Sequence, residues 1–372
     1  MTDTPPEPDR VEGAPHPRDT HVLIGQKAAE TEFLDAFNGG RLHHGWLITG
    51  PRGVGKATLA WKIARFLLAT PDHDGGMFAA PAPHSLDIPD SHPVARRLAA
   101  QSEGRLFLLR RPHDEKTLRL KQDITVNEVR RMKSFFSLSS ADGGRRVAII
   151  DSADDLNTSA ANALLKLLEE PPAGVTMLMI AHQPAALLPT IRSRCRTLRL
   201  GPLSAPDMAH ALTLAGVDAG DPTAMAELAG GSVGEAIRIA GLDGLRVYGQ
   251  LIETFATMPR LDRGRALALA DAAGARGAEA RFDLTLRLMD LFLARLARFG
   301  ATRTPPPEAC RGETDLLRRL APDGIAARHW ADLAQTLGLR ARRGRAVNLD
   351  PAALLLDMVL KIDATAGMLA QR

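Results

Sequence analysis

Short, nearly continuous apolar runs alternate with helical patterns over roughly the first 200 residues of the chain. Strands that are apolar along their whole length are typical of parallel sheets with helices on both faces, because neither face of such a strand meets water. The pattern therefore predicts an α/β fold with a parallel sheet. The expected strands are residues 45–50, 105–109, 146–150, 175–180 and 195–200.

The helices expected between these strands have recognisable limits. Apolar residues recur at helical spacing from residue 56 to about 68. Thr125 and Glu128 have the spacing of a capping box, so a helix is expected to begin there. An Ala/Leu-rich helix is expected over 157–170 and is stopped by two prolines. Residues 70–102 lack periodicity and are expected to form a surface loop or a short helical excursion.

The strand pattern ends near residue 203, and the rest of the chain reads as helical. Four regions follow from this change. Residues 1–20 are rich in proline and polar residues and are expected to be a disordered tail, and residues 21–203 form the α/β domain. Residues 204–243 are expected to form a small helical domain, and residues 244–372 a domain of longer amphipathic helices.

Composition excludes several classes of protein. With 45% hydrophobic and 24% charged residues, the chain of 372 residues is an ordinary globular protein. Cys195 and Cys310 are too few for a disulfide framework or a four-cysteine zinc site, so two unpaired thiols in a reducing cytoplasm are expected. No apolar stretch is long enough to span a membrane. The net charge of +4 permits contact with nucleic acid, and the basic run 340–345 either meets DNA phosphates or is a solvated loop.

Residues 50–56 read GPRGVGK, the phosphate-loop pattern GxxxxGK, between an expected strand and an expected helix. Glycines let the backbone N–H groups turn toward an anion, the helix start adds a positive dipole, and the lysine reaches the terminal phosphates. The alternative is a glycine-rich turn with an incidental lysine. The expected nucleotide-binding residues are Gly50, Gly53, Val54, Gly55, Lys56, Ala57, Thr58 and Asp151.

The chemistry that normally accompanies this loop is degraded. The residue after the lysine should carry a hydroxyl for magnesium, but here it is Ala57, and Thr58 points about 100° away on a helix. Asp151 ends an apolar strand at the edge where ligands bind and could contact magnesium or its waters. The next residue is Ser152, which cannot act as a carboxylate base. Asp154 and the acid after it are expected to lie in a turn and to cap the next helix.

Four motifs occur in a characteristic order: His43-His44-Gly45, the phosphate loop, NALLKLLEEPP at 162–172 and Ser193-Arg194-Cys195. In this order the chain resembles the AAA+ clamp-loader subunits of bacterial DNA polymerase III over residues 21–240. The segment IIDSAD at 149–154 is more similar to the delta-prime type than to the motor type, which keeps Asp-Glu there. The resemblance implies an AAA+ P-loop domain, a helical lid domain and a helical collar domain that mediates oligomerisation.

The resemblance also implies a role for Arg194. In this family the arginine of the SRC motif lies at the subunit border and acts as an arginine finger in a neighbour's ATP site, where a guanidinium neutralises charge on the transferred phosphoryl group. The alternative is a surface ion pair. Gly234 stands where ATP-binding members of the family have a sensor arginine. Members of the family often carry a four-cysteine zinc module after the first helix, but that part of this chain contains no cysteine, so no metal is expected. His182 follows the fourth strand, where the family has a polar sensor of the γ-phosphate.

Changes at Ala57, Ser152 and Gly234 together indicate a subunit that supports a neighbour's hydrolysis. We therefore expect weak or non-hydrolytic binding of ATP or ADP and no self-contained ATPase activity, within a DNA polymerase III holoenzyme whose overall activity is DNA-directed DNA synthesis. The implied partners are motor and delta-type clamp-loader subunits, and through them the sliding clamp and primer-template DNA, in the cytoplasm. The alternatives are an active motor-type (gamma/tau) ATPase and a stand-alone AAA+ adaptor in DNA repair.

Overall fold

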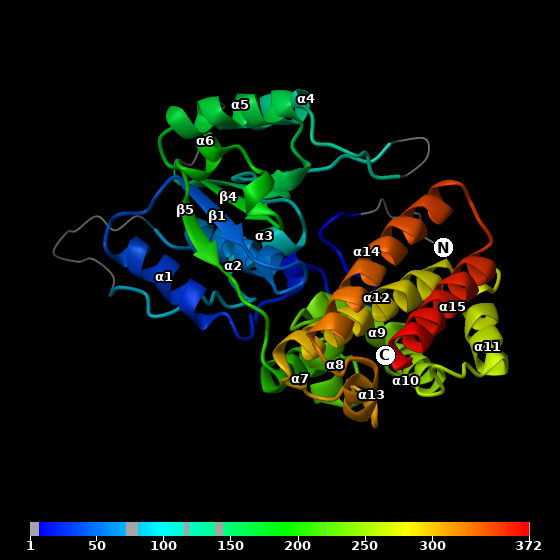
Figure 1. Ribbon diagram of the computed structural model, residues 1–372. Coiled ribbons are helices and arrows are strands. Elements are labelled where there is room, and N and C mark those ends of the chain that lie inside the picture. The colour runs from blue at the N-terminus through cyan, green and yellow to red at the C-terminus, as the bar shows by residue number, and fades with distance from the viewer. Residues whose placement is uncertain (1–6, 72–80, 115–118, 138–143, 219, 372) are drawn as a thin grey trace. The chain divides into compact units, whose positions relative to one another are not determined.

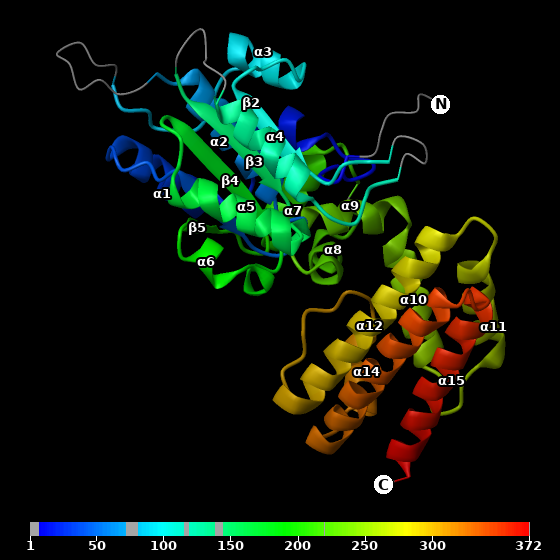
Figure 2. The same ribbon diagram turned by 90° about the horizontal axis from the view of Figure 1, so that it is seen from above.

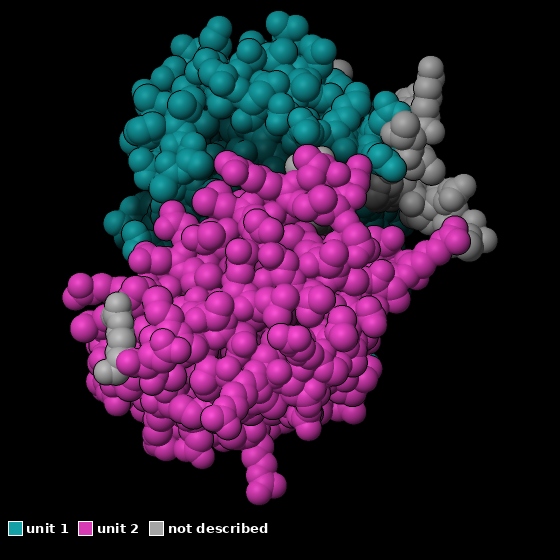
Figure 3. Space-filling view, turned by 45° about the vertical axis from the view of Figure 1, so that its right-hand side comes forward, with its two compact units in different colours: residues 1–216, 231–234 teal, residues 217–230, 235–372 magenta. Residues whose placement is uncertain are grey.

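The computed structural model describes residues 7–71, 81–114, 119–137, 144–218 and 220–371. The chain separates into two compact units, shown in different colours in Figure 3. Unit 1 comprises residues 1–216 and 231–234, and unit 2 comprises residues 217–230 and 235–372. The finer division into an α/β, a lid and a collar domain remains a prediction.

The described residues of unit 1 form a five-stranded parallel sheet in the order β2-β3-β4-β1-β5. The expected α/β fold is thus confirmed, and each strand agrees with its expected limits to within one residue. β1, which leads into the phosphate loop, lies between β4 and β5. The strands are β1 (Gly45–Thr49), β2 (Leu106–Arg110), β3 (Arg146–Asp151), β4 (Val175–Ala181) and β5 (Arg196–Arg199).

Helices cover both faces of this sheet, with α4 and α5 on one side and α1 and α2 on the other (Figures 1 and 2). The helices of unit 1 are α1 (Lys27–Asn38), α2 (Lys56–Ala69), α3 (Pro93–Ala99), α4 (Val126–Ser137), α5 (Thr158–Glu169), α6 (Pro189–Arg192) and α7 (Ala205–Leu214). Short 3₁₀ turns form at Pro17–Asp19, Ala153–Asp155 and Pro184–Ala186. α3 is the helical excursion expected within residues 70–102, of which residues 72–80 lie outside the described part of the chain.

The core explains why the strands read as continuous apolar runs. Alternate strand residues such as Leu47, Ile150 and Met179 pack with the buried faces of α4 and α5. The intervening residues face the other way, where Trp46 packs on Phe33 of α1 with ring centroids 4.8 Å apart. Because both faces are buried, a strand without polar alternation is the stable choice.

Beyond residue 203, the described residues form helices and no strand, as the sequence predicted. The remaining helices are α8 (Pro222–Ala229), α9 (Val233–Gly241), α10 (Gly244–Phe255), α11 (Arg263–Gly274), α12 (Glu279–Thr302), α13 (Glu313–Leu320), α14 (Gly324–Ala346) and α15 (Pro351–Ala370). α12, α14 and α15 run side by side (Figures 1 and 2). The interpretation of residues 340–345 as a loop is wrong, because they lie in α14, where Arg340 pairs with Asp357 of α15 at 2.5 Å.

Residues 7–20 differ from the expected disordered tail. They fold onto unit 1, and His16 is only 5% exposed. The Arg18 guanidinium pairs with Glu7 at 3.0 Å and the Arg18 carbonyl accepts a hydrogen bond from Arg65 of α2 at 2.6 Å. The composition of the segment concealed this order, because paired charges and one buried ring take the place of an apolar core. Residues 1–6 of the expected tail lie outside the described residues.

Among the helices that the structure describes, none combines the length and apolarity that crossing a membrane requires.

Candidate nucleotide site and Arg194

The phosphate loop has the backbone geometry that its glycines allow. Gly50, Gly53 and Gly55 have φ angles of +143°, +78° and +100°. Residues with a Cβ atom rarely adopt such positive φ angles. A Cβ atom at Gly50 would overlap the Leu200 carbonyl oxygen, and one at Gly53 would overlap the Ser232 hydroxyl. Helix α2 begins at Lys56 directly after the loop, so the positive end of its dipole faces the loop.

Lys56 lies within this loop and is 3% exposed. Its Nζ donates hydrogen bonds to the carbonyl oxygens of Gly50 at 2.7 Å and Pro51 at 2.5 Å. Burial lowers the pKa of Lys56 to about 8, against the opposing influence of the Asp151 and Asp154 carboxylates. The amine is therefore still mostly cationic at neutral pH and places a positive charge where a phosphate would be held.

The residues of the loop fit a nucleotide phosphate better than they fit magnesium. The turned backbone, the helix start and the Lys56 amine together form an anion cradle, and the glycines of the loop leave no room for a Cβ against the residues packed around them. Ala57 has no oxygen to offer a metal ion, and the hydroxyl of Thr58 is one helical position further along. The loop could therefore hold a phosphate but lacks the hydroxyl ligand of a magnesium site.

Asp151 ends β3 at the carboxyl edge of the sheet, as predicted, and is 7% exposed. Burial, followed by the nearby Asp9 and Asp155 carboxylates, raises the pKa of Asp151 to about 7. The neighbouring Ser152 is also buried, at 3% exposure. The side chain that follows the strand is thus a small hydroxyl, as the sequence indicated, and not a carboxylate base.

Asp154 has a different task from the expected helix cap. Its carboxylate accepts hydrogen bonds from the backbone N–H groups of His182 at 2.5 Å and Gln183 at 3.0 Å, just past β4. Helix α5 is capped instead by Asn157, whose Oδ1 accepts from the Ala160 N–H at 2.9 Å. Burial, and then the positive charge of Lys56, lower the pKa of His182 to about 4, so a neutral imidazole lies beside the loop at neutral pH.

Gly234 contacts the phosphate loop directly. Its N–H donates to the Gly53 carbonyl at 3.1 Å, and a Cβ at Gly234 would lie 3.3 Å from the Gly53 Cα. Residues 231–234 belong to the same compact unit as the loop. The glycine found where a sensor arginine was expected therefore allows this close approach of two backbones.

The backbone conformation of Gly53 predicts that a side chain at this position destabilises the protein. Gly53→Ala is expected to lower the free energy of unfolding by about 1–3 kcal/mol, because alanine resists the left-handed conformation and would overlap Ser232. Gly104→Ala is the matched control, because nothing lies within 4 Å of a Cβ there. Urea unfolding of both variants measures the difference. Equal midpoints would show that the loop relaxes around the added methyl group.

Gln26 supports the loop from the other side and was missed by the sequence analysis. Its Nε2 donates to the carbonyl oxygens of Gly201 at 2.8 Å and Val54 at 3.3 Å, and its Oε1 accepts from the Gly201 N–H at 3.2 Å. The side chain is 5% exposed, so these bonds satisfy a buried amide. A single glutamine ahead of a helix carries no pattern that would have revealed this contact.

Arg194 lies at the other end of the sheet from the phosphate loop. It precedes β5, whereas the loop follows β1, and these neighbouring strands are parallel. Arg194 and the loop are therefore separated by the length of a strand, which rises about 3.3 Å per residue. The guanidinium donates to the Thr190 carbonyl at 3.1 Å and pairs with Glu169 at 2.9 Å, so the two signature motifs meet. The side chain is 38% exposed. Arg194 therefore lies too far from the phosphate loop of its own chain to contact a phosphate bound there.

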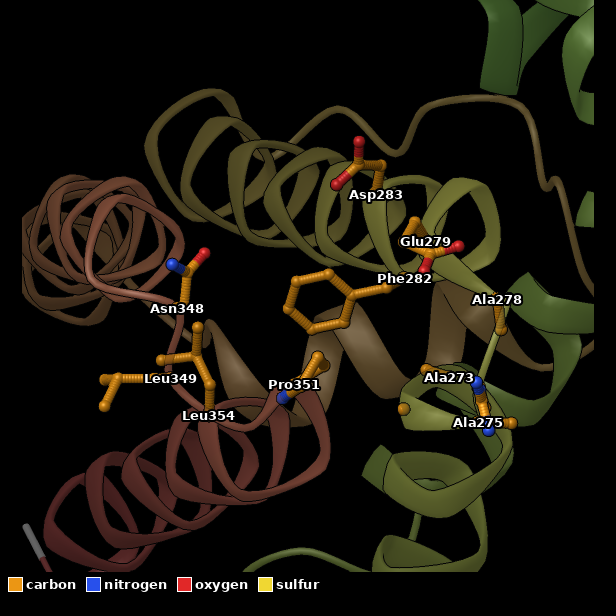
Figure 4. A pocket seen from close by; sticks show the side chains of 12 residues that line it. Ala273, Ala275, Ala278, Glu279, Phe282, Asp283, Asn348, Leu349, Pro351 and Leu354 are labelled. Atoms are coloured by element: carbon orange, nitrogen blue, oxygen red, sulfur yellow. The ribbon is translucent and has the colours of Figure 1, made fainter.

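A cavity of about 370 Å³ is lined by residues of unit 2 and by none of the residues of this site. It lies between the end of α11, the start of α12 and the start of α15, beside Phe282, Pro351 and Leu354 (Figure 4). Polar groups such as Asp283 and Asn348 lie at its border (Figure 4). No sequence motif of chemical interest maps to it.

The sheet, the phosphate loop after its β1 strand, the acid ending β3 and the following helical regions define a P-loop protein of the AAA+ type. Residues 25–204 match the family model described as "DNA polymerase III, delta subunit". This segment, just under half of the chain, is therefore similar to the DNA polymerase III delta subunit family.

Curated proteins of the same polymerase are also similar to part of the chain. The chain is 35% identical over 159 residues to the DNA polymerase III subunit delta' of Pseudomonas aeruginosa, covering 42% of this chain and 43% of that protein. It is 29% identical to subunit delta' of Escherichia coli, covering 46% of each, and 29% identical to its subunit tau, covering 51% of this chain and 26% of tau. The match thus spans less than half the length of these relatives.

Among solved structures, a DNA polymerase III gamma-subunit-related protein from Thermotoga maritima is similar, with a TM-score of 0.39 and 16% identity over 90% of this chain and 99% of that chain.

Proposed function

We propose that the chain is a clamp-loader subunit of the delta-prime type, which assists ATP hydrolysis at a neighbouring subunit and does not hydrolyse ATP itself. The observation that carries the proposal is the position of Arg194, half-exposed and one strand length from the chain's own phosphate loop. The changes at Ala57, Ser152 and Gly234 support the same conclusion, because they remove the magnesium hydroxyl, the base and the sensor arginine.

In this mechanism the chain contributes a preorganised cation. The Glu169 carboxylate and the Thr190 carbonyl hold two sides of the Arg194 guanidinium, so little side-chain freedom is lost when it enters a neighbour's site. ATP bound by the neighbour supplies the phosphoryl group on which negative charge develops. The remaining N–H donors of Arg194 neutralise that charge, which lowers the barrier without any proton transfer by this chain.

The partners follow from the same proposal. Motor and delta-type subunits would bind this chain, and the assembled complex would place the sliding clamp on primer-template DNA during replication. The chain's own loop would bind ATP or ADP weakly and without hydrolysis, and no zinc is needed.

Turnover by the isolated chain tests the assignment. We expect the purified chain to release phosphate from ATP no faster than a protein-free blank, because no carboxylate base follows Asp151. Phosphate release is measured with and without magnesium, with a motor-type subunit as the positive control. Robust turnover that Lys56→Ala abolishes would instead support a motor-type ATPase. The similarity to subunit tau is the reason for testing this alternative.

Co-purification distinguishes a clamp-loader subunit from the other alternative, a stand-alone AAA+ adaptor in DNA repair. A tagged chain expressed in its own cells is expected to retain other clamp-loader subunits through washing at moderate salt. A stand-alone repair adaptor would retain none of them.

A further inference from the structure

The N-terminal segment carries a compact network of charges, which we call the strap (residues 7–20). Glu7 and Asp9 provide two carboxylates, and both pair with Arg110 at 3.0 Å. His16 lies 3.3 Å from both carboxylates, and Arg18 pairs with Glu7 at 3.0 Å. The side chain of Asp9 is fully buried and that of Glu7 is 10% exposed. Such sheltered ion pairs are screened less than surface pairs, so they fix the strap in place.

The strap is anchored beside Asp151. Arg110 is the last residue of β2 and lies opposite Asp151 in the register of β2 with β3. Burial alone would raise the pKa of Asp9, but His16 and Arg110 hold it below its ordinary value. Asp9 is therefore a carboxylate at neutral pH, and its negative charge is felt at Asp151.

The strap then reaches residues that border the phosphate loop. The Val11 Cγ2 atom lies 3.4 Å from where a Cβ of Gly234 would be, and Gly234 is hydrogen-bonded to Gly53 of the loop. Further along, His16 packs edge-on against Trp61 of α2, with ring centroids 6.1 Å apart. The strap thus runs from beside Asp151 to Gly234, which borders the loop, and to Trp61 of the helix that follows the loop.

We propose that the strap is a built-in competitor of nucleotide, which keeps the phosphate loop from binding ATP or ADP tightly. The Glu7 and Asp9 carboxylates form ion pairs with Arg110, so the Arg110 guanidinium is not available to an incoming phosphate. They also add negative charge beside a site that must accept a polyanion. Val11 brings the same segment beside Gly234, the residue whose N–H is hydrogen-bonded to Gly53 of the loop. This inference concerns the chain's own loop and holds whether or not Arg194 acts on a neighbour.

The test uses full-length chain carrying Glu7→Gln together with Asp9→Asn. Binding of fluorescently labelled ADP is measured by anisotropy, without magnesium, and thermal unfolding checks that the variant is folded. Affinity is expected to rise at least tenfold over the unaltered chain. Adding Lys56→Ala to the double variant should remove the gain, which would place the bound ADP at the loop. Glu12→Gln is the matched control, because Glu12 lies exposed on the same strap.

Hydrogen exchange gives a second measurement that needs no strap variant. Saturating ADP added to the unaltered chain is expected to increase amide exchange across residues 7–20, because nucleotide and strap exclude each other. Equal affinity of the unaltered chain and the double variant, whether both bind or neither does, would overturn the proposal. Protection of residues 7–20 by ADP would overturn it as well, since the strap would then be part of a nucleotide-binding surface.

Discussion

Arg194→Ala is expected to slow ATP hydrolysis in a reconstituted clamp-loader complex by about 10³-fold or more at the site that this chain borders, as arginine fingers do when supplied in trans. The cause is the loss of a cation that stabilises charge in the transition state. ATP binding at that site should change much less, because the effect belongs to the transition state and not to the ground state. Single-turnover hydrolysis and equilibrium ATP binding, measured on the same complex, separate the two.

Arg192→Ala is the matched control for this experiment. Arg192 is exposed two residues earlier, so its removal changes the same local charge without touching the Glu169 pair. Equal hydrolysis rates for unaltered, Arg192→Ala and Arg194→Ala complexes would remove the finger role and leave Arg194 as a surface ion pair. Surface pairs of that kind contribute roughly 0–1 kcal/mol, so stability alone would not distinguish the variants.

Arg295→Met is expected to destabilise unit 2 by about 3–5 kcal/mol, the cost of leaving a buried charge without its partner. Arg295 and Glu313 are 3% and 1% exposed at their side chains and pair at 2.6 Å. Arg295 also pairs with Glu227 at 3.0 Å and donates to the Pro307 carbonyl at 2.5 Å. Burial alone would lower the pKa of Arg295, but its hydrogen bond to Glu313 raises the pKa above its ordinary value.

The second half of this network explains why removing the arginine is so costly. Glu313 also accepts hydrogen bonds from the Tyr248 hydroxyl at 2.6 Å and the Ala309 N–H at 2.9 Å, so it cannot turn away to solvent. Urea unfolding followed by circular dichroism measures the loss. Arg298→Met serves as control, because Arg298 is exposed on the same helix. A loss no larger than that of the control would mean that the carboxylate is neutralised at little cost.

The sheet and the loop could be predicted because each follows from short-range rules. A strand buried on both faces must be apolar at every position, so Val147 to Ile150 could be recognised without its neighbours. The Thr125–Glu128 capping box likewise needs only four consecutive residues, and the structure forms it with a hydrogen bond of 2.9 Å from the Thr125 N–H to Glu128.

The contacts that could not be predicted join residues far apart in the chain. Gln26 meets Gly201, and Asp9 meets Arg110, through polar groups that leave no periodic signal. The Glu169–Arg194 pair joins two motifs that were recognised separately, but nothing in their spacing places them together. Residues 340–345 were misread for the opposite reason, since a dense run of arginines with a glycine resembles a loop although it continues a helix.

The parallel arrangement of β1 and β5 gives each such domain a direction, with a phosphate loop at one end and an arginine at the other. Domains that join loop to arginine form a head-to-tail series, which either closes into a ring or has two different ends. A member with an exposed arginine and a degraded loop can supply the arginine to a neighbour's ATP site, but it has no hydrolysing site of its own for a neighbour's arginine to enter. If this chain acts as we propose, it is a catalytic terminus of its assembly, which then has fewer working ATP sites than subunits.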